Sequence, residues 1–327
     1  MFRGVIRGLC FWLGLLACGQ ATCVVTADST AAQSARARRE IIRDVKSWAV
    51  QYRRINLFEV AASPFDLVVI DHRPDLLYGT EFPFSREDVR LMQRKPDGSR
   101  RLVVAYLSVG EAEDYRRYWS RAWTTAPAER PSWIGPENPR WPGNFPVRFW
   151  QNAWQSIMFG SAEAYLDRII AAGFDGVYLD RIDVYQEFVA ENPNAENDMV
   201  ALLTRLSDHA HRLNPRFLVV LQNAEELTRR PAVRRAIDAV AKEDLFYGVA
   251  HDGSRNAPET VAAAAKPIRD LQRAGTKVLL LEYPRDATAA TDIRAKAKAE
   301  GFTLLLGDRD LSALAPVFGE TATGRTN

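Results

Sequence analysis

The 327-residue sequence has only three cysteines, and all of them lie within the first 23 residues: Cys10, Cys18 and Cys23. The rest of the chain therefore offers no disulfide framework, thiol nucleophile or Cys-ligated zinc site. The sequence also lacks an H-E-x-x-H motif, a G-x-S-x-G nucleophile elbow, a Gly-rich dinucleotide loop and a Walker phosphate loop. These absences argue against zinc peptidases, serine hydrolases of the elbow type and nucleotide-binding enzymes.

Charge of one sign is also scarce, because the formal net charge is only +2. A dedicated nucleic-acid-binding protein concentrates basic residues on one surface, and no recognition-helix motif accompanies the arginines here. We therefore expect no nucleic-acid partner. We expect no cofactor and no metal either, although a magnesium or calcium site built from carboxylates alone stays open.

No apolar run is long enough to span a bilayer, but the N-terminus has the pattern of a targeting segment. Arg3 and Arg7 precede a short apolar run at 9–17, as in a signal peptide. The sequence at 15–19 resembles a bacterial lipobox, in which Cys18 would be lipidated, while ordinary cleavage after 17–21 is the alternative. We predict an exported protein, either a periplasmic or outer-membrane lipoprotein or a secreted protein, with membrane contact only through such an anchor.

The chain as a whole divides into four segments. We assign residues 1–23 to the signal peptide, 24–40 to a linker or the start of a helix, 41–318 to one domain, and 319–327 to a flexible tail. Hydrophobic content is 47% and charged content 26%, which is ordinary for a soluble globular protein. We expect a monomer.

Eight short apolar segments alternate with helical patterns through the domain. Near-continuous apolar runs are typical of parallel strands buried on both faces, and repeated strand–helix alternation predicts a parallel α/β fold. The eight segments are Trp48–Tyr52, Leu67–Asp71, Leu102–Leu107, Val177–Asp180, Phe217–Leu221, Ala239–Lys242, Val278–Leu281 and Thr303–Leu306. Eight such segments favour a single (β/α)8 TIM barrel over an open doubly wound sheet.

Polar residues follow six of these segments, where the strands of a barrel end at a common mouth. Active sites of α/β barrels are built at that end. Asp180 is the most informative case, because it closes the apolar run Gly176–Leu179 and a carboxylate is costly to bury without a partner there. The other polar residues that we place at the mouth are Asp71, Tyr106, Glu111, Asp183, Asn223, Glu243 and Glu282.

The longest segment without a strand–helix repeat, 110–160, holds six of the eight tryptophans. It follows the third strand, so we expect it to lie over the mouth, and a loop of this length is uncommon unless it serves function. Aromatic faces can stack on sugar rings, or the rings can form a small core of their own. We name Trp119, Trp150 and Trp154 as candidate sugar-stacking residues.

Paired carboxylates beside aromatic rings suit glycoside hydrolysis, in which one acid donates a proton and the other acts as nucleophile or base. The sequence also resembles a known family. The segments 103–119, 173–180 and 240–247, with the opening at 48–52, are similar to motifs of glycoside hydrolase family 114, the endo-α-1,4-polygalactosaminidase-like barrels. The resemblance runs from about Trp48 to Gly307.

The resemblance implies a TIM barrel with a catalytic Asp after the fourth strand and a catalytic Glu after the sixth. By position these are Asp180 and Glu243, although the pair Glu225–Glu226 lies nearby in sequence. It also implies a galactosamine-containing polysaccharide as substrate, with Glu243 as general acid/base and Asp180 as nucleophile or electrostatic partner. The alternatives are a non-catalytic carbohydrate-binding lipoprotein and a metal-dependent polysaccharide deacetylase.

Overall fold

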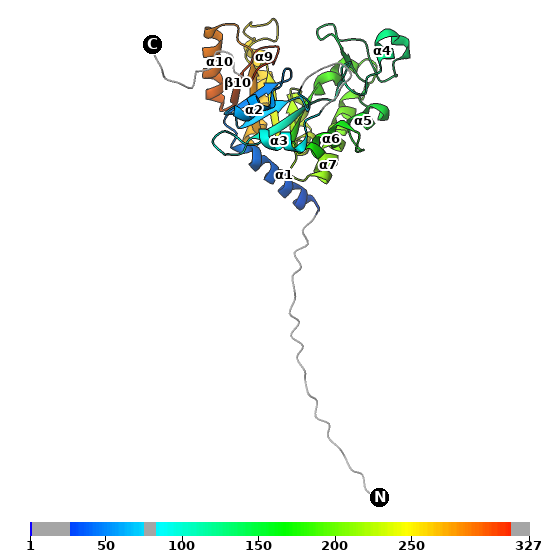
Figure 1. Ribbon diagram of the computed structural model, residues 1–327. Coiled ribbons are helices and arrows are strands. Elements are labelled where there is room, and N and C mark those ends of the chain that lie inside the picture. Colours follow the sequence, from blue (N-terminus) through cyan, green and yellow to red (C-terminus); the bar gives the residue numbers. More distant parts are fainter. Residues whose placement is uncertain (2–26, 75–82, 315–327) are drawn as a thin grey trace.

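The computed structural model describes residues 27–74 and 83–314, together with Met1. Eight parallel strands form one sheet with helices around it (Figure 1). In sheet order they are β1 (Trp48–Gln51), β2 (Leu67–Ile70), β3 (Leu102–Ser108), β6 (Gly176–Asp180), β7 (Leu218–Gln222), β8 (Ala239–Glu243), β9 (Lys277–Glu282) and β10 (Thr303–Leu306). All eight predicted strands are present within one or two residues of their expected ends.

The first and last strands lie side by side, which nearly closes the sheet into a barrel. The indole Nε1 of Trp48 on β1 donates to the carbonyl oxygen of Thr303 on β10 at 3.0 Å. Beyond the strand ends, the Tyr52 amide donates to the Leu311 carbonyl at 2.8 Å. The predicted (β/α)8 TIM barrel is confirmed.

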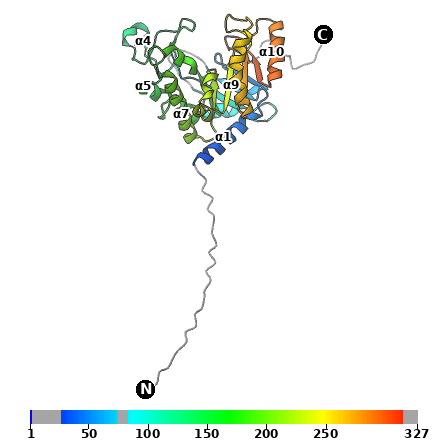
Figure 2. The ribbon, with the colours of Figure 1, turned by 180° about the vertical axis from the view of Figure 1, so that it is seen from behind.

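The helices follow the strands around the barrel (Figures 1 and 2). The α-helices are α1 (Ala27–Arg43), α2 (Leu57–Ala62), α3 (Arg86–Met92), α4 (Arg121–Thr125), α5 (Asn152–Met158), α6 (Tyr165–Ala172), α7 (Ala195–Leu213), α8 (Pro231–Ala236), α9 (Pro258–Arg273) and α10 (Ala287–Glu300). Short 3₁₀ helices are η1 (Pro127–Glu129), η2 (Ile182–Phe188) and η3 (Glu225–Arg229).

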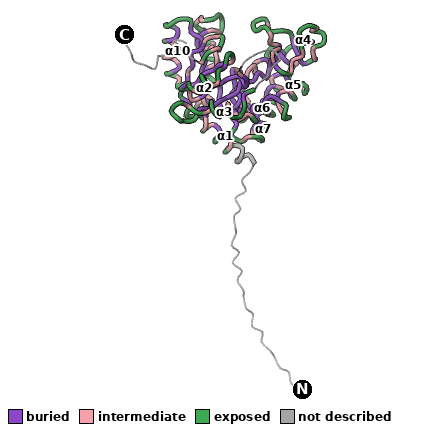
Figure 3. The backbone as a smooth tube through the Cα atoms, viewed as in Figure 1, coloured by how far each residue is buried: buried purple, intermediate pink, exposed green. Residues whose placement is uncertain are grey.

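Strand residues alternate between two buried cores, which explains the continuous apolar runs in the sequence. On β7, Leu218 and Val220 pack inside the barrel, whereas Val219 and Leu221 pack against the helices. Burial is concentrated along the strands and at the strand–helix layer (Figure 3). Inward and outward positions can therefore be assigned from this period of two.

Helix α1 closes the end of the barrel opposite the mouth. Ile42 and the following Val45 are buried in the same cluster as the inward-facing strand residues. Arg38 of α1 is buried too, and its Nε donates to Asp238 Oδ1 at 2.9 Å. From Ala27 on, the segment that we assigned to a linker or a helix start is thus a helix that packs on the barrel.

The long segment 110–160 contains an antiparallel pair of short strands, β4 (Glu111–Glu113) and β5 (Asn144–Pro146), together with α4, η1 and α5. Helices α4 and α5 stand on one side of the barrel, and α9 and α10 stand on the other (Figure 1). Cys18 and the tail 319–327 lie outside the described residues. None of the described helices has the length and apolar character needed to cross a membrane.

Candidate active site

Three neighbouring strands end in the same unusual way at the barrel mouth. The residue directly after each strand has a positive φ: Arg181 (59°) after β6, Asn223 (52°) after β7 and Asp244 (53°) after β8. Side-chain-bearing residues rarely adopt this left-handed conformation, and such strain clusters at functional sites. Because β6, β7 and β8 are neighbours in the sheet, the three turns lie beside one another at the mouth.

Asp180 is the last residue of β6, and both of its carboxylate oxygens accept hydrogen bonds. The Tyr106 hydroxyl donates to Oδ2 at 2.9 Å, and the Arg181 amide donates to Oδ1 at 2.8 Å. Burial and, secondly, the nearby Glu243 carboxylate raise the pKa of Asp180 to about 7, against the opposing effect of these two donors. The carboxyl group is therefore held rigidly and binds a proton near neutral pH.

Glu243 is the last residue of β8. The Tyr283 hydroxyl donates to its Oε1, and Asn223 Nδ2 donates to Oε2 at 3.3 Å. Asn223 Oδ1 in turn accepts from the Glu243 amide at 3.1 Å, so this asparagine clamps both ends of the residue. Burial raises the pKa of Glu243, Tyr283 and Asn223 counteract that rise, and Asp244 adds to it.

The two carboxyl groups face one cavity of about 420 Å³ at the mouth, which we call the carboxylate cavity. Because the Glu243 carboxylate raises the pKa of Asp180, protons bind to the two acids as a coupled pair. Such a pair can keep one acid protonated beside an ionised partner, as general acid catalysis requires. Five other residues that the sequence placed at the mouth also line it: Asp71, Tyr106, Glu111, Asp183 and Asn223.

Asp71 lines the carboxylate cavity but is engaged in an ion pair. Arg116 donates from Nη1 to Oδ1 at 3.0 Å and lies 2.9 Å from Oδ2 through Nη2, while its Nε donates to Glu113 Oε2 at 2.6 Å. Burial by itself would raise the pKa of Asp71, but Arg116 and His72 outweigh it and hold that pKa well below its usual range. Asp71 thus stays ionised and anchors the segment after β3 to β2.

Glu111 has a similar partner in Arg181. The Arg181 Nε lies 3.0 Å from Glu111 Oε1, and the same guanidinium contacts Asp183 and Glu187. Asn138 also donates to Glu111 Oε1, at 2.8 Å. Burial raises the pKa of Glu111 and Arg181 opposes the rise. Of these three acids, Glu111 is buried at 5%, whereas Asp183 and Glu187 have exposed side chains, at 42% and 49%.

The structure corrects the prediction for Glu282. Its side chain is 0% exposed and does not line the carboxylate cavity. It points out of the barrel and accepts hydrogen bonds from the backbone amides of Phe246 at 2.7 Å and Tyr247 at 3.3 Å. Along β9 the inward positions are Leu279 and Leu281, so the period of two places Tyr283, not Glu282, at the mouth.

The three tryptophans that we named as sugar-stacking candidates do not line the carboxylate cavity either. Trp154 is 0% exposed and donates from Nε1 to the Val109 carbonyl at 2.8 Å, so it is a core residue. Trp119 stacks on Phe145 with ring centroids 4.6 Å apart. These rings form the small core that holds the 110–160 segment together.

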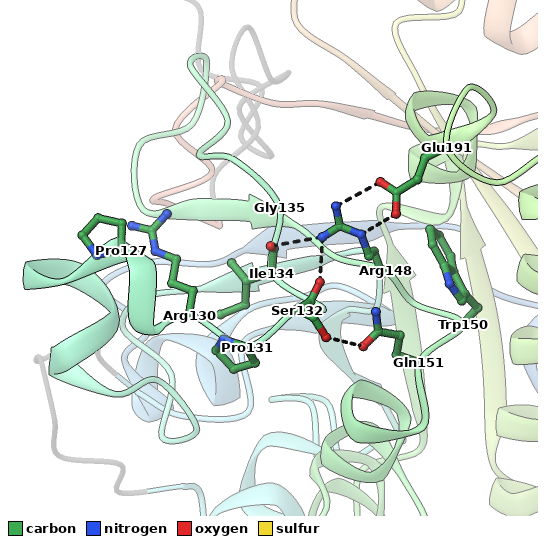
Figure 4. Close-up of a pocket in the computed structure, with 10 residues that line it drawn as sticks. All are labelled: Pro127, Arg130, Pro131, Ser132, Ile134, Gly135, Arg148, Trp150, Gln151 and Glu191. Atoms are coloured by element: carbon green, nitrogen blue, oxygen red, sulfur yellow. Dashed lines mark hydrogen bonds and ion pairs between the residues drawn. The ribbon is translucent and has the colours of Figure 1, made fainter.

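Trp150 lies in a separate hollow of about 560 Å³ on the outer side of that segment (Figure 4). The polar groups there are used by the fold: Arg148 donates to both oxygens of Glu191 and to the carbonyls of Ser132 and Ile134. Gln151 accepts from the Ser132 hydroxyl at 3.1 Å. The hollow therefore has no side chain arranged for chemistry.

Several cavity residues escaped the sequence analysis. Trp141, which is 51% exposed, is the aromatic ring that the cavity presents to solvent. Tyr52, Tyr115, Tyr283 and Arg309 also line it. Tyr283 could have been found from the alternation on β9. Trp141 and Arg309 lie in loops, where no periodic pattern indicates a direction. Within residues 27–74 and 83–314, no group of three or more His, Cys, Asp or Glu side chains is placed to hold a metal ion.

The raised pKa of Asp180 predicts how stability depends on pH. Asp180 has its ordinary pKa of 3.8 when unfolded and a pKa of about 7 when folded. Between these pH values the folded state binds more protons, so stability falls as pH rises. Asp180→Asn removes this penalty. We expect the variant to be more stable than the wild type by about 1–3 kcal/mol at pH 8, and by much less at pH 4, since one pKa unit corresponds to about 1.4 kcal/mol.

Urea unfolding of both proteins at pH 4, 6 and 8 measures this difference. Asp208→Asn, at an exposed position of α7, is the matched control and should show no pH-dependent gain. A constant difference between Asp180→Asn and the wild type across this range would contradict the raised pKa.

Comparison with known proteins agrees with this geometry. Residues 27–323 match the model of glycoside-hydrolase family GH114. An uncharacterized protein of Deinococcus radiodurans is 37% identical over 280 residues, covering 85% of each chain. One from Thermotoga maritima is 33% identical over 78% of each chain.

Among solved structures, the glycoside hydrolase domain of PelA from Pseudomonas aeruginosa superposes with a TM-score of 0.60. The alignment covers 83% of this chain and 97% of that domain at 20% identity, so it supports the fold. The family model spans the barrel and all of the residues that line the carboxylate cavity. The chain therefore belongs to glycoside-hydrolase family GH114 and is a glycoside hydrolase.

Proposed function

We propose that this protein is an exported enzyme that cleaves an amino-sugar-containing polysaccharide with Asp180 and Glu243. The observation that carries this proposal is the pair itself: the carboxyl groups of Asp180 and Glu243 lie at the ends of β6 and β8 and line one cavity. After burial, the Glu243 carboxylate is the main cause of the raised pKa of Asp180. Glu243 is the general acid/base, and Asp180, in its ionised form, is the nucleophile or electrostatic partner. Tyr106 and Asn223 orient them through the hydrogen bonds described above.

The charge of the cavity lining supports a cationic sugar. Eight carboxylic acids and four arginines line the cavity. The acids are Asp71, Glu111, Glu113, Asp180, Asp183, Glu243, Asp244 and Asp310, and the arginines are Arg53, Arg140, Arg181 and Arg309. A deacetylated galactosamine residue carries an ammonium group, and opposite charge in a cleft raises its local concentration. This complementarity supports a partly deacetylated, galactosamine-containing polymer as the substrate. Cleavage of such a polymer within its chain would be endo-α-1,4-polygalactosaminidase activity.

Two separate segments border the cavity, which supports action within a polymer chain. Arg140, Trp141 and Asn144 of the 110–160 segment lie on its lining, and so do Arg309, Asp310 and Leu311 after β10. Helix α1 lies at the opposite end of the barrel (Figure 1). An N-terminal anchor at Cys18 would therefore leave the cavity open toward the polysaccharide.

The test is release of oligosaccharides by the purified mature protein from a panel of polysaccharides that includes partly deacetylated α-1,4-galactosaminogalactan. We expect oligosaccharide products from the amino-sugar polymer, unchanged by a metal chelator. Binding without products from any polymer would instead favour a non-catalytic carbohydrate-binding protein. Loss of activity with chelator would favour a metal-dependent deacetylase.

Trp141 is expected to contribute to polymer binding rather than to stability. An aromatic ring stacked on a ligand contributes about 0.5–1.5 kcal/mol, so Trp141→Ala should raise KM about 2- to 12-fold. Because this side chain is half exposed, the free energy of unfolding should change by less than about 0.5 kcal/mol. Phe58→Ala, at a 71% exposed aromatic away from the cavity lining, is the control. An unchanged KM for Trp141→Ala would remove this residue from the substrate site.

A further inference from the structure

Arg309, in the segment after β10, connects that segment to the loop after β8. Its Nη1 and Nη2 donate to the two carboxylate oxygens of Asp244 at 2.8 and 2.9 Å, and Nη2 also lies 2.9 Å from Asp252 Oδ1. Two parallel hydrogen bonds between a guanidinium and a carboxylate fix both groups in orientation. Asp244 directly follows Glu243 and has a positive φ, so this pair holds the strained turn at the end of β8.

The same ion pair is closely packed against Gly248. A Cβ at this position would lie 2.4 Å from Asp244 Oδ1 and 2.8 Å from Arg309 Nη2, and Gly248 itself has a φ of 106°. Only glycine fits both the space and the backbone conformation. The loop after β8 is thus shaped around the Arg309–Asp244 pair.

The flat face of the Arg309 guanidinium contacts a second residue of the site. Its Cζ lies 4.1 Å from the centroid of the Tyr283 ring, within the range of a cation–π interaction. The Tyr283 hydroxyl donates to Glu243 Oε1. Arg309 therefore reaches Glu243 by two routes, through the ring of Tyr283 and through the backbone turn at Asp244.

We propose that Arg309 is a positioning residue for Glu243: it holds the Tyr283 hydroxyl and the Asp244 turn in the places that orient the Glu243 carboxyl group. This inference rests on the proposed function in giving Glu243 a catalytic role. The structural coupling between Arg309 and Glu243 can nevertheless be measured without turnover.

The charged groups around Glu243 indicate how Arg309 affects the pKa of that residue. The groups that act on this carboxyl group are Tyr283, Asp244, Asn223 and Lys242. The carboxyl group in turn raises the pKa of Asp180, Tyr178 and Tyr52, which also face it. Asp244 raises the pKa of Glu243. Arg309 lowers the pKa of Asp244 and balances its charge, although burial of Asp244 acts in the opposite direction and more strongly. Without Arg309, Glu243 would face an unbalanced neighbouring carboxylate.

The experiment is an NMR titration of ¹³C-carboxyl-labelled glutamate in the mature protein, with the Glu243 resonance assigned by its loss in Glu243→Gln. We expect Arg309→Met to raise the titration midpoint of Glu243 by about one pH unit. Asp244→Asn should lower it, and the double variant should return it to within about 0.3 pH units of the wild type, because the charge pair is removed together. Arg309→Lys should keep the titration midpoint of Glu243, because the positive charge is retained. It should lose the paired hydrogen bonds to Asp244 and the guanidinium contact with the Tyr283 ring.

Turnover on the polysaccharide gives the second readout. Arg309→Met and Arg309→Lys should both lower kcat, about 10- to 100-fold. The alkaline limb of the pH profile, which reports the general acid, should move to higher pH only in Arg309→Met. Arg285→Met is the matched control, since Arg285 approaches Asp252 at 3.7 Å but is not bonded to Asp244. Circular dichroism verifies folding, and Arg309→Lys keeps the test valid if Arg309→Met unfolds.

Two results would overturn the proposal. One is a Glu243 midpoint in folded Arg309→Met equal to that of the wild type, and the other is kcat unchanged in both Arg309 variants. A wild-type protein that cleaves no polysaccharide would count against the proposed function, while the titration would still decide whether Arg309 is coupled to Glu243.

Discussion

Glu243→Gln is expected to lower kcat on the amino-sugar polymer by about 10²–10⁴-fold, the usual contribution of general acid–base catalysis. The glutamine side chain has nearly the same shape, and its carbonyl oxygen can still accept from the Tyr283 hydroxyl that now contacts Oε1. Binding should therefore be retained while proton transfer is lost. Asp180→Asn should produce a loss of similar or greater size, because the Asp180 carboxylate cannot be replaced by an amide as nucleophile or charge partner.

Single-turnover and steady-state assays with the same polymer, together with a binding measurement, separate these effects. Glu226→Gln is the matched control, because the pair Glu225–Glu226 was the competing match by sequence. In the structure Glu226 accepts from the Tyr185 hydroxyl at 2.6 Å and is not on the carboxylate cavity lining. Activity that survives in Glu243→Gln but disappears in Glu226→Gln would show that the general acid has been misassigned.

Arg116→Met is expected to destabilise the fold by about 3–5 kcal/mol at pH 7, the range for breaking a buried ion pair from one side. Arg116 is 5% exposed and lies between Asp71 at 2% and Glu113 at 5%. Its removal takes the nearest guanidinium from both buried carboxylates, while Arg73 Nε stays 3.9 Å from Asp71 Oδ1. Because this pair also fastens the segment after β3 beside the mouth, kcat should fall as well.

The pH dependence provides a sharper test of the same variant. In the wild type the depressed pKa of Asp71 adds stability above the unfolded pKa, and that stability is lost as pH falls through the folded pKa. In Arg116→Met the Asp71 carboxyl group is no longer held ionised by Arg116, so it can take up a proton at a higher pH than in the wild type. The loss in unfolding free energy relative to the wild type should therefore become smaller toward pH 4. Urea unfolding at pH 4 and 7 measures both values.

Arg117→Met is the control for this experiment. The Arg117 side chain is 41% exposed and pairs with Glu163, which is 80% exposed, so its removal should cost less than about 1 kcal/mol. The double variant Asp71→Asn/Arg116→Met should recover part of the lost stability. A deficit in Arg116→Met that equals the Arg117→Met value, or that does not change with pH, would show that the buried network contributes little.

The sequence by itself determined the barrel and which acids lie at the ends of its strands. Strands buried on both faces must be apolar throughout, so eight such runs separated by helical patterns specify a parallel sheet with helices around it. An acid that directly follows such a run has to lie at the carboxyl end of its strand. This rule put Asp180, Glu243 and Glu282 alike at strand ends, and the resemblance to the family singled out Asp180 and Glu243 as the pair.

The tertiary structure decided which other side chains reach the cavity. One residue of register separates Glu282, which points outward to backbone amides, from Tyr283, which contacts Glu243. Trp154 and Trp141 lie in one segment, yet only the structure shows that the first is core and the second borders the cavity. Arg309 meets Asp244 across 65 residues of sequence. A strand's apolar pattern depends on its own neighbours in the chain, whereas the direction of a loop side chain depends on packing between segments that the sequence keeps far apart.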